Sequence, residues 1–163
     1  MTIEPACTHA VPVADAAATL ALGEKLAGRL RAGDTLLLEG GLGAGKTTLA
    51  RGIITALTGE VDVPSPTYTL VQTYDAPAFE APALEIWHAD LYRLEAPADI
   101  LPLGLLDVRD EVVSLIEWPD RMGDYRPRDA LHVEIQFDEE GRRVVFTAFE
   151  HTQWREWLES VFD

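Results

Sequence analysis

The sequence predicts a single α/β domain over residues 1–163, with a mostly parallel central sheet between two layers of helices. Two short apolar runs, at 34–40 and 111–118, are typical of buried parallel strands. Stretches with helical spacing alternate with extended stretches along the chain. A glycine-rich segment joins the first apolar run to a helix, and this strand–loop–helix order also favours the α/β class.

The first predicted helix covers residues 15–31, where Asp15 is a good N-cap and leucines recur on one face. Gly33 is expected to end this helix. The apolar strand 34–40 follows, and the spacing of Leu and Ile then predicts a second helix over 46–58. The glycine-rich segment therefore lies between a strand and the start of a helix.

Two stretches rich in β-branched and aromatic residues, 67–74 and 84–92, are predicted to be strands that pair as neighbours. The connection between them, 76–83, is rich in Ala and Pro. A short helix is expected after Pro97, because proline suits the first turn of a helix. The run 111–118 is the second predicted buried strand.

The last part of the chain is predicted to form a hairpin and a helix. Residues 131–137 and 142–149 alternate between apolar and polar side chains, and the turn segment 138–141 joins them. This pattern predicts an antiparallel hairpin appended to the parallel sheet. Residues 152–162 have the spacing of an amphipathic terminal helix.

Acidic residues outnumber basic ones by 28 to 13, and the formal net charge is −15. Such a charge repels phosphate backbones, and the sequence shows no basic stripe, so direct binding of DNA or RNA is not expected. Cys7 is the one cysteine, so no disulfide can form within the chain. The sequence shows no membrane-spanning run and no signal peptide, which together predict a cytoplasmic protein.

Residues 40–47 fit the phosphate-loop pattern G-x-x-x-x-G-K-[ST]. Glycines allow backbone N–H groups to turn inward and form a cradle for phosphates at the start of a helix. Lys46 adds a positive charge, and the Thr47 hydroxyl can bind a magnesium ion. The pattern predicts a P-loop NTPase-like fold that binds a nucleoside triphosphate through Gly41, Leu42, Gly43, Ala44, Gly45, Lys46, Thr47 and Thr48.

Two acidic residues follow predicted strands, where parallel-sheet proteins place their sites. Glu117 ends the run 111–118 and is a candidate to hold the metal or the attacking water, rather than an ordinary exposed carboxylate. Asp90 follows the second extended stretch. It is either a second functional acid or a turn residue paired with Arg93, and the sequence favours neither.

Other polar and aromatic residues near these positions have two interpretations each. Thr67 lies in a Pro-rich segment that is either a clamp sensing the γ-phosphate or a plain turn. His88 falls in a strand pattern and is interpreted as a packed histidine rather than a catalyst. Trp118 either offers an exposed indole or caps the core. The chain has no asparagine and so lacks the N-K-x-D element that selects guanine.

Four segments, "GLGAGKTT", "SPTYTL", "HADLYRL" and "IEWPDR", occur in the order and spacing of the TsaE (YjeE) family, and the sequence resembles that family over about residues 19–143. Members are small bacterial ATPases needed for threonylcarbamoyl modification of the adenosine beside the anticodon of tRNAs. The resemblance implies ATP/ADP and Mg²⁺ as cofactors and TsaB and TsaD as partners. It also implies that TsaD performs the transfer, and that the ATPase is weak alone and contacts tRNA only through these proteins.

The resemblance assigns roles to individual residues. It implies Lys46, Thr67, Asp90 and Glu117 as catalytic residues, with Thr47 and Glu117 as magnesium ligands and Asp90 as a second essential acid near the metal. Further nucleotide contacts are implied at Ala16, Gly141, Arg142 and Trp118. One departure is visible, because the family commonly has Asp where this chain has Gly41.

Two other functions are compatible with the residues. A small phosphate-loop kinase would use Arg121, Arg126 and Arg128 as a lid over the transferred phosphoryl group, although a solvated loop is the preferred interpretation of that segment. An adaptor that binds ATP without hydrolysing it is the other. An ATPase would release free phosphate, whereas the kinase would transfer the phosphoryl group to a metabolite and the adaptor would release none.

Overall fold

The computed structural model describes residues 5–77, 83–149 and 153–163. The strands are β1 (Cys7–Val13), β2 (Thr35–Glu39), β3 (Val71–Ala76), β4 (Leu84–Asp90), β5 (Val113–Glu117), β6 (Leu131–Asp138) and β7 (Gly141–Ala148). The helices are α1 (Ala16–Ala27), α2 (Lys46–Thr58), α3 (Leu105–Val108) and α4 (Gln153–Phe162), with 3₁₀ helices η1 (Pro97–Leu103) and η2 (Pro119–Tyr125). None of the helices in these three ranges has the length and apolar character needed to cross a membrane.

The strands form one sheet in the order β1-β7-β6-β2-β5-β4-β3. The four central strands, β6, β2, β5 and β4, are parallel to one another, whereas β3, β7 and β1 are added antiparallel at the two edges. The predicted α/β class is confirmed, but the sheet is mixed rather than mostly parallel. The predicted hairpin supplies β6 and β7, and β3 pairs with β4 as expected.

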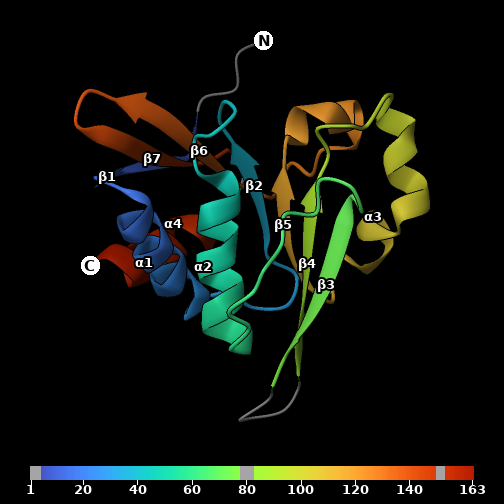
Figure 1. Ribbon diagram of the computed structural model, residues 1–163, viewed down its shortest axis with the longest axis horizontal. Helices are drawn as coiled ribbons and strands as arrows, with labels where there is room; N and C mark the ends of the chain where they lie inside the picture. Colours follow the sequence, from blue (N-terminus) through green and yellow to red (C-terminus); the bar gives the residue numbers. More distant parts are fainter. Residues whose placement is uncertain (1–4, 78–82, 150–152) are drawn as a thin grey trace.

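Two apolar cores lie on opposite faces of the sheet, because successive residues of a strand point to opposite sides. Leu36 and Leu38 pack in the larger core with α1, α2 and α4, whereas Leu37 between them packs in the smaller core with η1 and α3. Figure 1 shows α1 and α2 on one side of the sheet and α3 on the other. The sheet is therefore the middle of three layers.

The helix predicted over 15–31 is shorter in the structure. It begins as expected, because the Asp15 side chain accepts a hydrogen bond from the Ala18 N–H at 2.8 Å. It ends at Ala27, since the N–H of Gly28 already bonds the carbonyl of Leu26 and the chain tightens there. The expected end at Gly33 was wrong, although Leu30 of the predicted helix is buried all the same.

The strand predicted over 67–74 begins later, at Val71. Leu70 has a φ of 65°, and its N–H bonds the carbonyl of Pro66 at 2.7 Å, so residues 67–70 form a turn. The part of the predicted 76–83 connection at 78–82 and the predicted helix start at residue 152 lie outside the described residues.

The edge strand β1 was missed in the sequence. It pairs antiparallel with β7 from Cys7 opposite Ala148 to Val13 opposite Arg142. Its sequence contains Pro12, which lacks the N–H that a central strand needs but is tolerated at an edge. Its alternation of half-buried and exposed residues follows from the contact with β7. The formation of β1 thus depends on pairing with β7, which lies far along the chain.

Helices α1 and α2 cross at two glycines. A Cβ atom on Gly52 would lie 2.5 Å from the carbonyl oxygen of Leu20, and one on Gly23 would lie 2.6 Å from that of Leu49. Only residues without a side chain allow the two backbones to approach this closely. The crossing fixes α2, and with it the start of α2, against α1.

Gly52→Ala is expected to lower the free energy of unfolding by about 1–3 kcal/mol, because the added methyl group meets backbone atoms that cannot turn away. Gly28→Ala is the matched control, since Gly28 has a helical φ of −63° and its Cβ would meet nothing closer than 3.9 Å. That control is expected to change stability by less than about 1 kcal/mol. Urea unfolding of both variants measures this difference, and equal stabilities would contradict the close crossing.

Candidate functional site

The carboxyl ends of three adjacent parallel strands lie side by side. We call this border of the sheet, which differs from its edge strands, the carboxyl edge. Asp90 and Glu117 end β4 and β5 and lie opposite each other in the register, and Glu117 also pairs with Leu38 of β2. The loop that leaves β2 reaches the same edge before it enters α2 (Figure 1). This edge is where open parallel sheets bind their ligands.

The glycine loop, residues 40–47, needs glycine at several positions. Gly40, Gly43 and Gly45 have φ values of 145°, 74° and 115°, which side chains disfavour. A Cβ on Gly40 would also lie 2.8 Å from the carbonyl oxygen of Ile135. Gly45 is the N-cap of α2, so the free N–H groups of the first turn of α2 begin directly after it. The backbone conformation of the loop therefore requires glycine at these positions.

Lys46 is turned back onto the glycine loop. Its Nζ donates to the carbonyl oxygens of Gly40 at 2.7 Å and Gly41 at 2.9 Å, and lies 4.1 Å from the centre of the Trp118 ring. Burial lowers the pKa of Lys46, against the opposing charges of Glu117, Asp90 and Asp120. The ammonium group thus lies where it has few water contacts and several acidic neighbours.

Trp118 owes its position to an uncommon backbone conformation. Its φ is 58°, in the left-handed region that bulky residues rarely adopt. The indole is only partly exposed and packs between Lys46 and Tyr92, whose ring centre is 4.9 Å away. Such conformations are concentrated at functional sites, where surrounding contacts maintain them.

Glu117 is the centre of a buried polar group. The Thr47 hydroxyl donates to its Oε1 at 2.8 Å and lies 3.1 Å from its Oε2, while Nε2 of His88 lies 2.7 Å from Oε2. Glu117 is 2% exposed and His88 0%. We call Thr47, His88 and Glu117 the Glu117 cluster. Glu117 is thus not an exposed carboxylate, and His88 is a member of the candidate site that the sequence pattern did not reveal.

Asp90 is held by the turn that precedes β3. Its Oδ2 accepts from the Thr67 hydroxyl at 3.1 Å, and its Oδ1 accepts from the Tyr92 N–H at 3.0 Å. Ser65 extends this series of hydrogen bonds, because its hydroxyl oxygen lies 2.7 Å from that of Thr67. Arg93 does not pair with Asp90 and lies instead 4.3 Å from the centre of the Tyr68 ring. The structure therefore joins Thr67 and Asp90, whose roles the sequence left open.

Of the residues assigned near the ends of the chain, Arg142 contacts the glycine loop, and the other two lie at the start of β7, which contains Arg142, and at the start of α1. Arg142 donates to the carbonyl oxygen of Gly43 at 3.0 Å. Gly141 approaches the segment between β1 and α1 so closely that a Cβ would lie 2.8 Å from the carbonyl oxygen of Ala14. Ala16 starts α1 two residues later and is exposed. Of the remaining loop residues, Leu42 is exposed, Ala44 is buried and Thr48 is partly buried.

The three arginines considered as a lid have different surroundings. Arg126 lies 3.4 Å from a carboxylate oxygen of Glu39, and Arg121 lies 5.5 Å from the centre of the Tyr92 ring. Arg128 is exposed and makes none of these contacts. The structure therefore gives no support to a lid built from all three.

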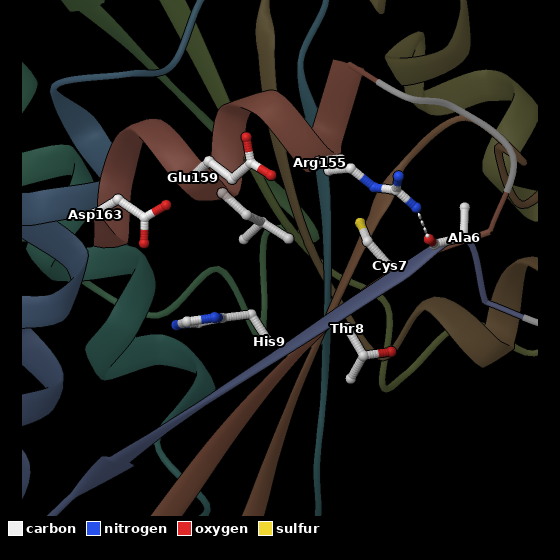
Figure 2. Close-up of a pocket in the computed structure, with 8 residues that line it drawn as sticks. Ala6, Cys7, Thr8, His9, Arg155, Glu159 and Asp163 are labelled. Carbon is white, nitrogen blue, oxygen red and sulfur yellow. Dashed lines mark hydrogen bonds between the residues drawn. The ribbon is translucent and has the colours of Figure 1, made fainter.

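Two surface hollows lie away from this edge, and none of the predicted site residues lines them. One, of about 330 Å³, lies between β1 and α4 (Figure 2). Arg155 closes part of its rim by donating to the carbonyl oxygen of Ala6 at 2.7 Å, and the His9 ring stacks on Phe162 nearby. The candidate site is therefore an open edge of the sheet rather than either hollow.

The residues can provide oxygen ligands for a magnesium ion. The Thr47 hydroxyl and the Glu117 carboxylate are hard oxygen donors in direct contact, and Mg²⁺ is typically held by one or two carboxylates together with phosphate oxygens and water. In the part of the chain that the structure describes, no three His, Cys, Asp or Glu side chains are grouped to hold a metal on their own. A magnesium ion bound here would thus need ligands from a nucleotide and water.

Fold and site together define an α/β protein with a glycine loop between a strand and a helix, facing two strand-end carboxylates. The chain belongs to the TsaE family, because the sequence model described as "Threonylcarbamoyl adenosine biosynthesis protein TsaE" matches residues 13–145.

Individual relatives agree with the family model. The chain is 39% identical over 137 residues to the tRNA threonylcarbamoyladenosine biosynthesis protein TsaE of Nostoc, covering 80% of both chains. The protein of that name from Mycobacterium leprae is 38% identical over 74% of this chain and 76% of its own. The crystal structure of YdiB from Bacillus subtilis superposes with a TM-score of 0.73 at 25% identity, covering 99% of this chain and 96% of that one.

Gly41→Asp is expected to leave the free energy of unfolding within about 0.5 kcal/mol of the wild type. The φ of Gly41 is not positive, and a Cβ atom on Gly41 would meet only Phe137, at an ordinary contact distance of 3.8 Å. Gly40→Ala is the contrasting variant and is expected to cost about 1–3 kcal/mol, because its backbone is left-handed and its Cβ would strike Ile135. Thermal and urea unfolding compare the two, and a Gly41→Asp protein as unstable as Gly40→Ala would contradict the open position.

Proposed function

We propose that this protein is a Mg²⁺-dependent ATPase that supports threonylcarbamoyladenosine formation in tRNA by acting on a TsaB–TsaD complex in the cytoplasm. The observation that carries the proposal is the contact between the Thr47 hydroxyl, at the start of α2, and the buried Glu117 carboxylate. It joins the end of a phosphate-loop motif to an acid at the end of a parallel strand. The names of the relatives supply the tRNA pathway.

The glycine loop would hold the phosphates through main-chain N–H groups at the start of α2. Lys46 now bonds two carbonyl oxygens of that loop, so its ammonium group would exchange these partners for phosphate oxygens when ATP binds. The indole of Trp118 limits where this charge can lie. Arg142, which reaches the carbonyl of Gly43, and the segment at Ala16 and Gly141 would line the nucleotide on the other side of the loop.

Thr47 and Glu117 would hold Mg²⁺, which neutralises the phosphate charge when it is bound. The Thr47 hydroxyl can donate its proton to Glu117 and still offer an oxygen lone pair to a cation. Asp90 would act beside them through the hydroxyl of Thr67, which it holds on the turn before β3. That turn is therefore the candidate to respond to the γ-phosphate.

The partner proteins would cover this same edge of the sheet. Three exposed aromatic side chains lie against arginines: Tyr68 against Arg93, Tyr92 against Arg121 and Phe137 against Arg142. Aromatic residues and arginine are enriched where proteins bind one another tightly. With a net charge of −15, the surface favours protein partners over direct contact with tRNA.

Lys46→Ala is expected to abolish ATP binding, whereas Glu117→Gln is expected to keep measurable binding and to lower turnover by about 100-fold or more. The first change removes the charge that pairs with the phosphates, and the second removes the charge that holds the metal or the water. Titration calorimetry with ATP and Mg²⁺ measures binding, and phosphate release with and without TsaB and TsaD measures turnover.

Lys25→Ala is the matched control, since Lys25 is the only other lysine and lies 5.1 Å from the Phe162 ring, in α1. It is expected to behave as wild type in both assays. Equal loss of binding in the Lys46 and Glu117 variants would contradict their separate roles. ATP consumption that yields a phosphorylated metabolite instead of free phosphate would favour a kinase.

Tyr68→Ala and Phe137→Ala are each expected to weaken binding to TsaB–TsaD at least about tenfold without lowering the melting temperature. The two side chains are 82% and 63% exposed, so their truncation leaves no cavity in the core. Val61→Ala is the control, because Val61 is 86% exposed and follows the far end of α2. Surface plasmon resonance compares the three variants. Unchanged affinity in both aromatic variants would place the partner elsewhere.

A further inference from the structure

His88 has surroundings that packing alone does not explain. It lies in β4, opposite Leu115 of β5, and follows the fully buried Ile86 on the same face of the strand. Its ring is 0% exposed, and its Nε2 lies 2.7 Å from Oε2 of Glu117. An imidazole in a dry core is costly unless its nitrogens are hydrogen-bonded. The contact with Glu117 therefore satisfies one of the two ring nitrogens.

The other nitrogen of the ring shows which tautomer fits. Among the described residues, Nδ1 of His88 is buried and has no hydrogen-bond partner. If His88 is the donor in this contact, its proton lies on Nε2, because a carboxylate oxygen then only accepts. An unpaired acceptor at Nδ1 is less costly than an unpaired N–H. A ring with its proton on Nε2 and none on Nδ1 fits both observations.

We propose that His88 is a positioning residue that holds Oε2 of Glu117 and so turns Oε1 toward Thr47 and the metal. The proposal rests on the proposed function of the site. Thr47 lies closer to Oε1, at 2.8 Å, than to Oε2, at 3.1 Å, which agrees with a carboxylate held from the Oε2 side. The two donors come from different elements, one on α2 and one on β4, so together they restrict the rotation of the carboxylate.

Removing the donor would leave Oε2 of a buried carboxylate with only its longer contact to the Thr47 hydroxyl, at 3.1 Å. Such a carboxylate gains by turning toward another donor, and the Lys46 ammonium group is close enough to interact with its charge. This rotation would move Oε1 of Glu117 away from the Thr47 hydroxyl. Groups that orient a metal ligand in this way change metal affinity or activity by about 10–100-fold when they are removed.

Four variants test the proposal. His88→Leu and His88→Asn remove the donor, because the Asn amide is too short to reach Oε2, whereas His88→Gln places an amide N–H near the position of Nε2. Ile86→Ala disturbs the same strand and core without touching Glu117. ATP affinity is measured with Mg²⁺ and with EDTA, and phosphate release with TsaB and TsaD is measured across Mg²⁺ concentrations.

Loss of the His88 donor is expected to change the Mg²⁺ dependence of turnover but not the affinity for ATP without metal. His88→Leu and His88→Asn should raise the Mg²⁺ concentration for half-maximal turnover by about 10–100-fold and leave ATP affinity in EDTA unchanged. His88→Gln should recover most of the loss, and Ile86→Ala should keep the wild-type Mg²⁺ dependence. The role of His88 is overturned if the Leu and Asn variants keep that dependence, if Ile86→Ala shifts it equally, or if His88→Gln rescues nothing.

A measurement without nucleotide tests the contact itself. In ¹⁵N-labelled wild-type protein, NMR of the histidine rings should place the His88 proton on Nε2 and show it exchanging slowly with water. A proton on Nδ1 alone would overturn the proposal even if a variant fails to fold. A wild-type protein whose ATP affinity does not depend on Mg²⁺ would instead overturn the proposed function, and this inference with it.

Discussion

The buried carboxylate of Glu117 is the point on which this edge of the sheet depends. A carboxylate that is 2% exposed is costly unless donors surround it, and here they come from two separate elements. α2 supplies the Thr47 hydroxyl and β4 supplies the His88 ring. The parallel register of β4 with β5 places His88 within reach, and the crossing of α1 and α2 fixes Thr47. The fold is thus what satisfies the charge.

The sequence predicted the features that local patterns encode. The glycine loop and the acid ending a buried strand were both identified, because the motif has fixed spacing and a buried strand is a continuous apolar run. The structure places these two features in contact. The α/β class and the hairpin at the end of the chain also follow from periodicity.

Features that depend on distant partners were not predictable. The role of His88 needs the register between two strands, which periodicity does not specify. β1 becomes a strand because β7 lies beside it, and its own sequence carries a proline. The turn at 67–70 has β-branched and aromatic residues but is closed by the left-handed Leu70, so composition favoured a strand where geometry does not. Tertiary contacts override local preference at all three places.

The distances along the chain within the Glu117 cluster have a consequence for synthesis on the ribosome. Thr47 and Glu117 are 70 residues apart, and His88 and Glu117 are 29 apart. At about 5–20 residues per second, the loop emerges several seconds before the acid. A nascent chain, or a fragment truncated ahead of β5, carries the cradle without the carboxylate that completes it. The proposed site is therefore complete only late in translation, when the last central strands have joined the sheet.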